Sequence, residues 1–128
     1  MIYVDTSIVL AELLSEDRRP DASLWQETLV CSRLLEFELW TRLFAYGCGD
    51  SHGEAARGIL LRLSFLEMVP TVLKRALEPF PKPVRTLDAL HLSSFHYLLQ
   101  RCAGLRLATF DTRMAGVANA LGFSMYPA

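Results

Sequence analysis

Four acidic residues stand at positions from which they could act together on one ligand: Asp5, Glu38, Asp88 and Asp111. The first of them directly follows the short apolar run 2–4, and the last directly follows the apolar run 105–110. The second is expected one turn into a helix, and the third in the first turn of another. Because ligands of open parallel α/β sheets bind beyond the carboxyl ends of the strands, such positions can meet in one cleft.

Each of these acids alone has an ordinary structural explanation. Asp5 and Asp111 are good helix N-caps, and Asp88 suits the positive end of a helix dipole. Glu38 could pair with Arg42 one turn further along its helix. Carboxylates that converge on one cleft, however, raise one another's pKa values unless a cation is bound. Clustered oxygen ligands select hard ions such as Mg²⁺ or Mn²⁺, so the set predicts a divalent-cation site.

Other catalytic chemistries find no support in the remaining reactive residues. His52, His91 and His96 have neither HExxH nor Cys/His spacing, which disfavours zinc. His91 lies three residues after Asp88, on the same helix face, and is expected to pack or to support the site rather than to bind a metal. The sequence contains no GxSxG motif and no glycine-rich phosphate loop.

Alternating strand and helix signals define the elements that must position these acids. β-branched and apolar runs predict strands at 2–4, 29–31, 66–69 and 105–110, with an edge strand at 123–126. Helical patterns cover 8–14, 22–28, 34–46, 54–64, 71–77, 87–101 and 112–121, with Thr71, Thr86 and Asp111 as N-caps and Gly122 as the last stop. The segment 15–21 is expected to be a loop, and the prolines of 79–83 exclude a helix there. Strands alternating with helices predict an α/β fold with a parallel sheet covered on both faces.

Composition places the chain among ordinary globular domains. Its 128 residues are 52% hydrophobic and 21% charged, which excludes a disordered tail, and no apolar stretch is long enough for a membrane span. The first residues lack the pattern of a secretory leader, and three cysteines without CxxC spacing indicate free thiols in the cytoplasm. The formal net charge of −1 gives no global basic field for nucleic acid, although all cations except Lys74 and Lys82 are Arg.

Four segments carry a resemblance to a known family. They are Ile2-Tyr3-Val4-Asp5-Thr6-Ser7, then 32–39 around Glu38, 85–92 around Asp88, and 107–115 around Asp111. In order and spacing these segments resemble the four motifs of PIN-domain ribonucleases. The chain length resembles that of VapC-type toxins from bacterial toxin–antitoxin pairs.

The resemblance implies a single PIN-like domain over residues 1–128, a three-layer fold with a short central parallel sheet flanked by helices. It implies a metal-dependent endoribonuclease in which Asp5, Glu38, Asp88 and Asp111 hold Mg²⁺ or Mn²⁺, with Thr6 and Thr109 as supporting hydroxyls. A metal-activated water would attack the RNA phosphodiester bond; the carboxylate that acts as general base stays open. The implied partners are RNA, a VapB-like antitoxin and a second copy in a homodimer, with no membrane, in the cytoplasm.

Two alternatives stay open beside this interpretation. Glu36 and Glu38 point about 200° apart on a helix, so only one can face the site, and motif alignment selects Glu38. The chain could also be a catalytically lapsed PIN-like binding module, a scaffold or antitoxin sponge. Retention of four mutually repelling acids argues against a lapsed site.

The helix predicted at 34–46 has two apolar faces, which indicates a partner surface. Phe37, Trp40 and Phe44 share one face at helical spacing. The other face carries Leu35, Leu39, Leu43 and Tyr46. One face can pack on the sheet, and the second is then available to another chain.

Overall fold

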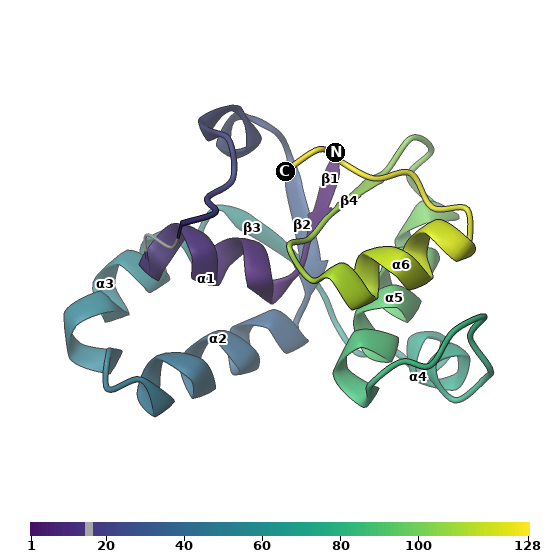
Figure 1. Cartoon of the computed structure of the whole chain (residues 1–128), viewed down its shortest axis with the longest axis horizontal. Helices are drawn as coiled ribbons and strands as arrows, with labels where there is room; N and C mark the ends of the chain where they lie inside the picture. The colour runs from purple at the N-terminus through teal and green to yellow at the C-terminus, as the bar shows by residue number, and fades with distance from the viewer. Residues whose placement is uncertain (15–16) are drawn as a thin grey trace.

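Four parallel strands form the central sheet, in the order β3-β2-β1-β4 (Figure 1). They are β1 (Ile2–Val4), β2 (Leu29–Ser32), β3 (Leu63–Leu66) and β4 (Arg106–Ala108). In the register, Ile2 lies opposite Leu29 on one side and Arg106 on the other. The computed structural model describes residues 1–14 and 17–128. The predicted parallel α/β sheet is confirmed.

Helices cover both faces of this sheet, which gives three layers (Figure 1). One side holds α1 (Thr6–Leu14), α2 (Leu34–Ala45) and α3 (Gly49–Leu60). The other side holds α5 (Thr86–Leu99) and α6 (Thr112–Ala120), with α4 (Pro70–Ala76) packed on α5. A short 3-10 helix, η1 (Ala22–Gln26), replaces the helix predicted at 22–28. Within the described ranges, every helix falls short of the length and apolarity needed to cross a membrane.

The alternation of side chains along the strands divides the core into two parts. Ile2 and Val4 point to the cluster beneath α1, α2 and α3, while Tyr3 between them points to the cluster beneath α5 and α6. All three side chains are fully buried. A strand that is buried on both faces reads as a continuous apolar run, which is why 2–4 was recognisable as a strand from its sequence.

The region between residues 46 and 70 differs from the sequence-based prediction. The predicted strand 66–69 lies at Leu63–Leu66, and the predicted helix 54–64 is α3, which begins at Gly49. The turn between α2 and α3 contains Gly47, whose φ is 69°. A Cβ at Gly49 would lie 2.7 Å from the Phe44 ring, so this glycine permits close packing against α2 and does not end a helix.

Smaller differences occur at the helix ends. Pro70 is the first residue of α4 and Val69 its N-cap, so Thr71 does not cap it, and Thr86 is the first residue of α5 rather than its cap. The predicted edge strand 123–126 is reduced to one bridge between Leu107 and Met125. The last helix matches its prediction: Asp111 caps α6 through bonds from two backbone N–H groups. Of the predicted loop 15–21, residues 15–16 lie outside the described residues.

Candidate active site

A cleft of about 530 Å³ opens beyond the carboxyl ends of β1 and β4. Its lining includes all four predicted acids together with Thr6: Asp5, Thr6, Glu38, Asp88 and Asp111. Ser7 and His91 also line it. Thr109, the second predicted hydroxyl residue, lies behind the lining and contacts Asp5. The structure thus brings the predicted site residues together around one cleft.

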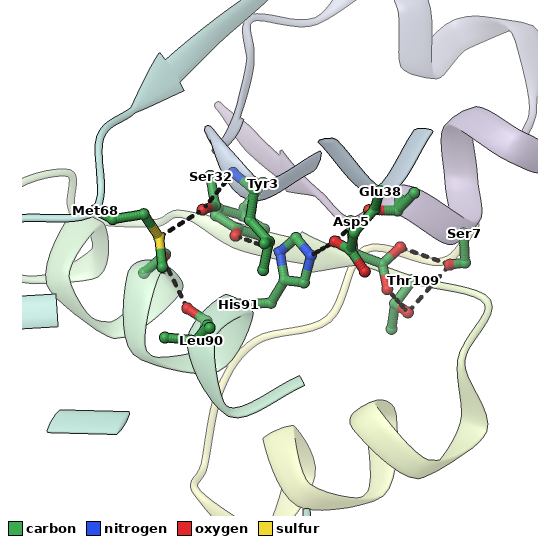
Figure 2. Close-up of polar contacts among 12 residues, drawn as sticks. Tyr3, Asp5, Ser7, Ser32, Glu38, Met68, Leu90, His91 and Thr109 are labelled. Atoms are coloured by element: carbon green, nitrogen blue, oxygen red, sulfur yellow. Dashed lines mark hydrogen bonds and ion pairs between the residues drawn. The ribbon is translucent and has the colours of Figure 1, made fainter. Parts of the chain in front are cut away.

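Asp5 is held by hydroxyl groups from both strand ends (Figure 2). The Ser7 hydroxyl donates to Oδ1 and the Thr109 hydroxyl to Oδ2, each at 2.5 Å. Asp5 is only 3% exposed, and this burial raises the pKa of its carboxyl. The charge of His91 and the two hydroxyl bonds oppose that rise in pKa without cancelling it. Asp5 therefore carries its charge at some cost to the fold.

The same two hydroxyls connect the ends of β1 and β4. Ser7 Oγ accepts the backbone N–H of Phe110 at 2.9 Å, and Thr109 Oγ1 accepts that of Asp111 at 2.9 Å. Each hydroxyl therefore receives one bond from the backbone and gives its own hydrogen to Asp5. This arrangement fixes the Asp5 carboxylate relative to α1 and to the segment 109–111 between β4 and α6.

Glu38 lies at the side of the cleft and uses one oxygen for two bonds (Figure 2). Its Oε1 accepts from Thr6 Oγ1 at 2.8 Å and from His91 Nε2 at 2.6 Å. Burial opposes the charge of Glu38, but the bonds from His91 and Thr6 outweigh it, so the pKa of Glu38 is lowered. In the described part of the chain, Glu38 thus has a partner across the fold instead of the expected ion pair with Arg42.

His91 joins Glu38 to the buried interior. It is 2% exposed, and its Nδ1 lies 2.8 Å from the hydroxyl of the fully buried Tyr3. A carboxylate only accepts, so Nε2 carries the hydrogen shared with Glu38. When the imidazole is neutral, Nδ1 then accepts the Tyr3 hydroxyl hydrogen, which fixes the tautomer. His91 was expected to pack or to support the site, and in the structure it is buried and supports Glu38.

Glu36 takes no part in the cleft. It lies on the same helix as Glu38 but forms an ion pair with Arg33 at 3.4 Å. Arg33 also pairs with Glu67 on the segment that follows β3. Of the two glutamates, Glu38 is the one that the helix presents to the other acids.

Asp88 and Asp111 complete the acidic lining from the opposite side. Asp111 Oδ1 accepts the backbone N–H of Arg113 and of Met114 as the cap of α6. Burial raises the pKa of Asp88, and the charge of Asp111 raises it further, followed by smaller contributions from Asp5 and Glu38. The carboxylates are therefore close enough for their charges to repel one another across the cleft.

The donor set fits a hard divalent cation by its chemistry. All four candidate ligands are carboxylates, and their mutual repulsion is the condition that a bound cation relieves. Within residues 1–14 and 17–128, no three His, Cys, Asp or Glu side chains already stand where they could share one ion. An ion held by three of them would therefore require side chains to rotate into the cleft.

Three supporting residues were not identified from the sequence in the roles that they have here. Ser7 was noted as part of the first family motif without a hydrogen-bond partner, Tyr3 as an apolar strand residue, and the partner of His91 was not predicted. The alternation of β1 could have indicated that Tyr3 faces α5, but its partner is 88 positions away. Such a pairing depends on how the helices dock, which one sequence does not reveal.

The four-stranded parallel sheet, its three layers and the acidic cleft at its carboxyl edge define a PIN-like nuclease fold. The PIN domain family matches residues 2–120 of this chain. The chain therefore belongs to the PIN-domain family, among its VapC-type members, as its four motifs predicted.

Two ribonucleases of known family are similar to this chain over nearly its whole length. Ribonuclease VapC46 of Mycobacterium tuberculosis is 31% identical over 127 residues, which cover 97% of this chain and 95% of the relative. Ribonuclease VapC47 of the same species is 28% identical over 130 residues, covering 96% and 93%.

Solved structures agree on the fold. Mycobacterium tuberculosis VapC20, described as a toxin that cleaves the sarcin–ricin loop, has a TM-score of 0.71 at 22% identity, covering 98% of each chain. A chain from a toxin–antitoxin complex of Klebsiella pneumoniae has a TM-score of 0.71 at 17% identity, covering 100% of this chain and 98% of that one. At these identities the likeness establishes the three-layer architecture.

Proposed function

We propose that this protein is the toxin of a type II toxin–antitoxin pair, an endoribonuclease that hydrolyses RNA phosphodiester bonds with Mg²⁺ or Mn²⁺. The observation that carries this proposal is the convergence of four carboxylates in one cleft at the carboxyl edge of the sheet. The similarity to two VapC ribonucleases over nearly the whole chain supports it. All 128 residues would then act as one catalytic domain in the cytoplasm.

The proposed catalytic and metal-binding residues are the four acids of the cleft: Asp5, Glu38, Asp88 and Asp111. A bound ion would supply charge stabilisation at the attacked phosphate and would lower the pKa of the attacking water. Thr6 and Thr109 act as supporting hydroxyls, since each donates to one of the acids. With Oε1 occupied by Thr6 and His91, Glu38 has Oε2 left for the cleft.

We assign the antitoxin to the exposed aromatic side of α2. Phe37 is 65% exposed and Phe44 is 67% exposed, whereas Leu35, Leu39 and Leu43 of the same helix are fully buried. Tyr46, which was predicted on the same face as Leu35, Leu39 and Leu43, is instead 57% exposed and lines the acidic cleft with Arg42. Large exposed aromatic side chains beside a cleft are typical of protein interfaces. A VapB-like antitoxin that bound here would lie next to the acidic cleft, which Tyr46 also lines.

A homodimer needs a second surface, and α4 with the start of α5 offers one. Leu73, Leu77 and Leu87 are large, exposed apolar side chains on these elements. Their exposure supports the proposed self-association. Sedimentation or light scattering of the protein without antitoxin measures it directly.

The decisive test is an RNA cleavage assay with purified protein. Metal-free protein should be inactive, and added Mg²⁺ or Mn²⁺ should produce endonucleolytic fragments. Variants that neutralise single cleft acids should lose this activity while remaining folded. A folded wild-type protein that binds RNA or antitoxin but cleaves no RNA with either metal would contradict the proposal and would favour the lapsed binding module.

A further inference from the structure

A second cleft of about 520 Å³ adjoins the acidic one and shares three lining residues with it, Arg85, Asp88 and Met114. It lies between the segment 82–85, the first turn of α5 and the N-terminal half of α6. Because the two clefts have this wall in common, a chain-like ligand held in one can continue into the other.

The second cleft is basic where the first is acidic. Lys82, Arg85 and Arg113 line it, and Asp88 is its one lining carboxylate. Within the described residues, none of these three cations forms an ion pair or donates a side-chain hydrogen bond. Like charges that gather without partners repel one another, and an anion between them removes that repulsion. We refer to these three residues and their cleft as the basic cleft.

The chain holds Lys82 in place for such a role. Pro81 and Pro83 flank it, and the two rings narrow the backbone conformations that this segment can adopt. The Lys82 ammonium reaches across to α6, where it lies 3.9 Å from the position that a Cβ of Gly116 would occupy. Gly116 is unfavourable inside a helix, but its missing side chain leaves this side of the basic cleft open.

We propose that the basic cleft binds the phosphate backbone of single-stranded RNA next to the bond that is cut. This inference rests on the proposed function, because it takes the acidic cleft as the place of cleavage. A cluster of four carboxylates repels a polyanion, and the net charge of −1 provides no long-range attraction. The adjoining cations supply the attraction, and the planar forks of Arg85 and Arg113 suit phosphate oxygens.

The experiment measures binding separately from cleavage. A fluorescently labelled single-stranded RNA oligonucleotide of mixed sequence is titrated with Asp5→Asn protein in Mg²⁺, alone and combined with Lys82→Ala or Arg113→Ala. The matched control is Arg101→Ala, which removes the same charge just beyond the far end of α5, where the Arg101 side chain bonds the Tyr97 carbonyl and lies over the Tyr97 ring. Each basic-cleft variant should raise the Kd about 5- to 10-fold at low salt and lower the salt dependence of log Kd by about 0.7. The control should stay within about twofold.

A gain of negative charge gives a second variant that is expected to fold. Gly116→Glu replaces a helix-interior glycine with a good helix former and places a carboxylate near Lys82. It should weaken RNA binding at least as much as Lys82→Ala. In cleavage by protein with an intact Asp5, all three basic-cleft variants should raise KM more than they lower kcat.

The outcomes separate this inference from the function on which it rests. If the basic-cleft variants bind RNA as Arg101→Ala does, with an unchanged salt dependence, the inference is wrong even if the wild type cleaves RNA. If they lose affinity for an antitoxin and none for RNA, the basic cleft binds an acidic protein segment, which also overturns it. Absence of cleavage by the wild type contradicts the proposed function, while the binding titration still reports on the basic cleft.

Discussion

Replacing Asp5 with asparagine should change catalysis and stability by different amounts, because the contacts of this side chain lead to a separate prediction for each. Asparagine keeps the shape and one acceptor oxygen but removes the negative charge. In the proposed mechanism that charge helps to hold the cation and the attacked phosphate. Loss of one group that stabilises developing charge typically lowers kcat by about 10²-fold or more. We expect Asp5→Asn to lose metal-dependent RNA cleavage on at least that scale.

The effect of Asp5→Asn on the free energy of unfolding combines two opposing contributions. Burial raises the pKa of Asp5, so the charged carboxylate destabilises the folded state and its removal is favourable. Ser7 and Thr109 each accept a backbone N–H and donate their own hydrogen to residue 5, and their two hydroxyl oxygens lie 3.4 Å apart. Asparagine offers one oxygen, so one of these hydroxyls loses its acceptor, which costs about 1 kcal/mol. The net change should therefore stay within about 1 kcal/mol in either direction.

The assay pairs RNA cleavage in Mg²⁺ with urea denaturation of the metal-free protein. Asp50→Asn is the control, because Asp50 is an exposed acid in the first turn of α3, away from the cleft. It should retain full cleavage. Full cleavage by folded Asp5→Asn would show that Asp5 is not catalytic. A destabilisation above about 3 kcal/mol would show that the hydroxyl bonds, rather than the burial of charge, dominate at this position.

Further predictions concern the metal, the supporting residues and the partner. Mg²⁺ or Mn²⁺ should raise the Tm of the wild type and not that of a variant with all four cleft acids neutralised, since an ion bound only by the folded state stabilises it; an equal shift in both would place the ion elsewhere. Tyr3→Phe keeps the buried ring and removes the bond to the imidazole, so cleavage should fall about 10-fold through kcat with KM little changed, the scale on which partners of site ligands act. Because the pKa of Asp88 is raised in the fold, the contribution of Asp88 to the free energy of unfolding falls as pH rises from about 4, its unfolded value; metal-free Asp88→Asn should therefore be more stable than the wild type at pH 7 and lose that advantage near pH 4. Phe44→Ala should weaken antitoxin binding in a pull-down or titration, whereas Leu77→Ala on the other exposed apolar surface should not.

The sequence predicted the parts of the fold whose signals are local. The run 2–4 is apolar on both faces and formed a buried parallel strand, and Asp111 with Gly122 bounded the last helix as expected. The third strand was placed three residues too late. The residues 47–53 were predicted to lie between two helices, but Gly49 accommodates the Phe44 ring and α3 begins there. Tertiary packing decided that boundary, and no local pattern could show it.

The same division applies to the site. Asp5 and Asp111 could be brought together from the sequence, because each directly follows a strand of a predicted parallel sheet. Glu38 and Asp88 lie on helices, and the resemblance to the family motifs selected them. The bonds from Thr6 and His91 to Glu38 and from Thr109 to Asp5 could not be predicted, since they join residues between 32 and 104 positions apart across different elements. The chain from Tyr3 through His91 to Glu38 links a strand in the core to the cleft. Only the docking of α5 on the sheet brings these three residues together.

The four acids are not held equally firmly, and this difference determines how the cleft is expected to respond to a cation. Asp5 is fixed by two hydroxyls, and Glu38 by Thr6 and His91. Asp88 has no such partner among the described residues, and the charges of the other acids raise its pKa. Repulsion is therefore expected to displace Asp88 more than the other acids. The same repulsion explains why, among the described residues, no three candidate ligands stand close enough to share one ion. On this argument Asp88 is the side chain that should move most when an ion binds, while Asp5 and Glu38 provide the fixed side of the site.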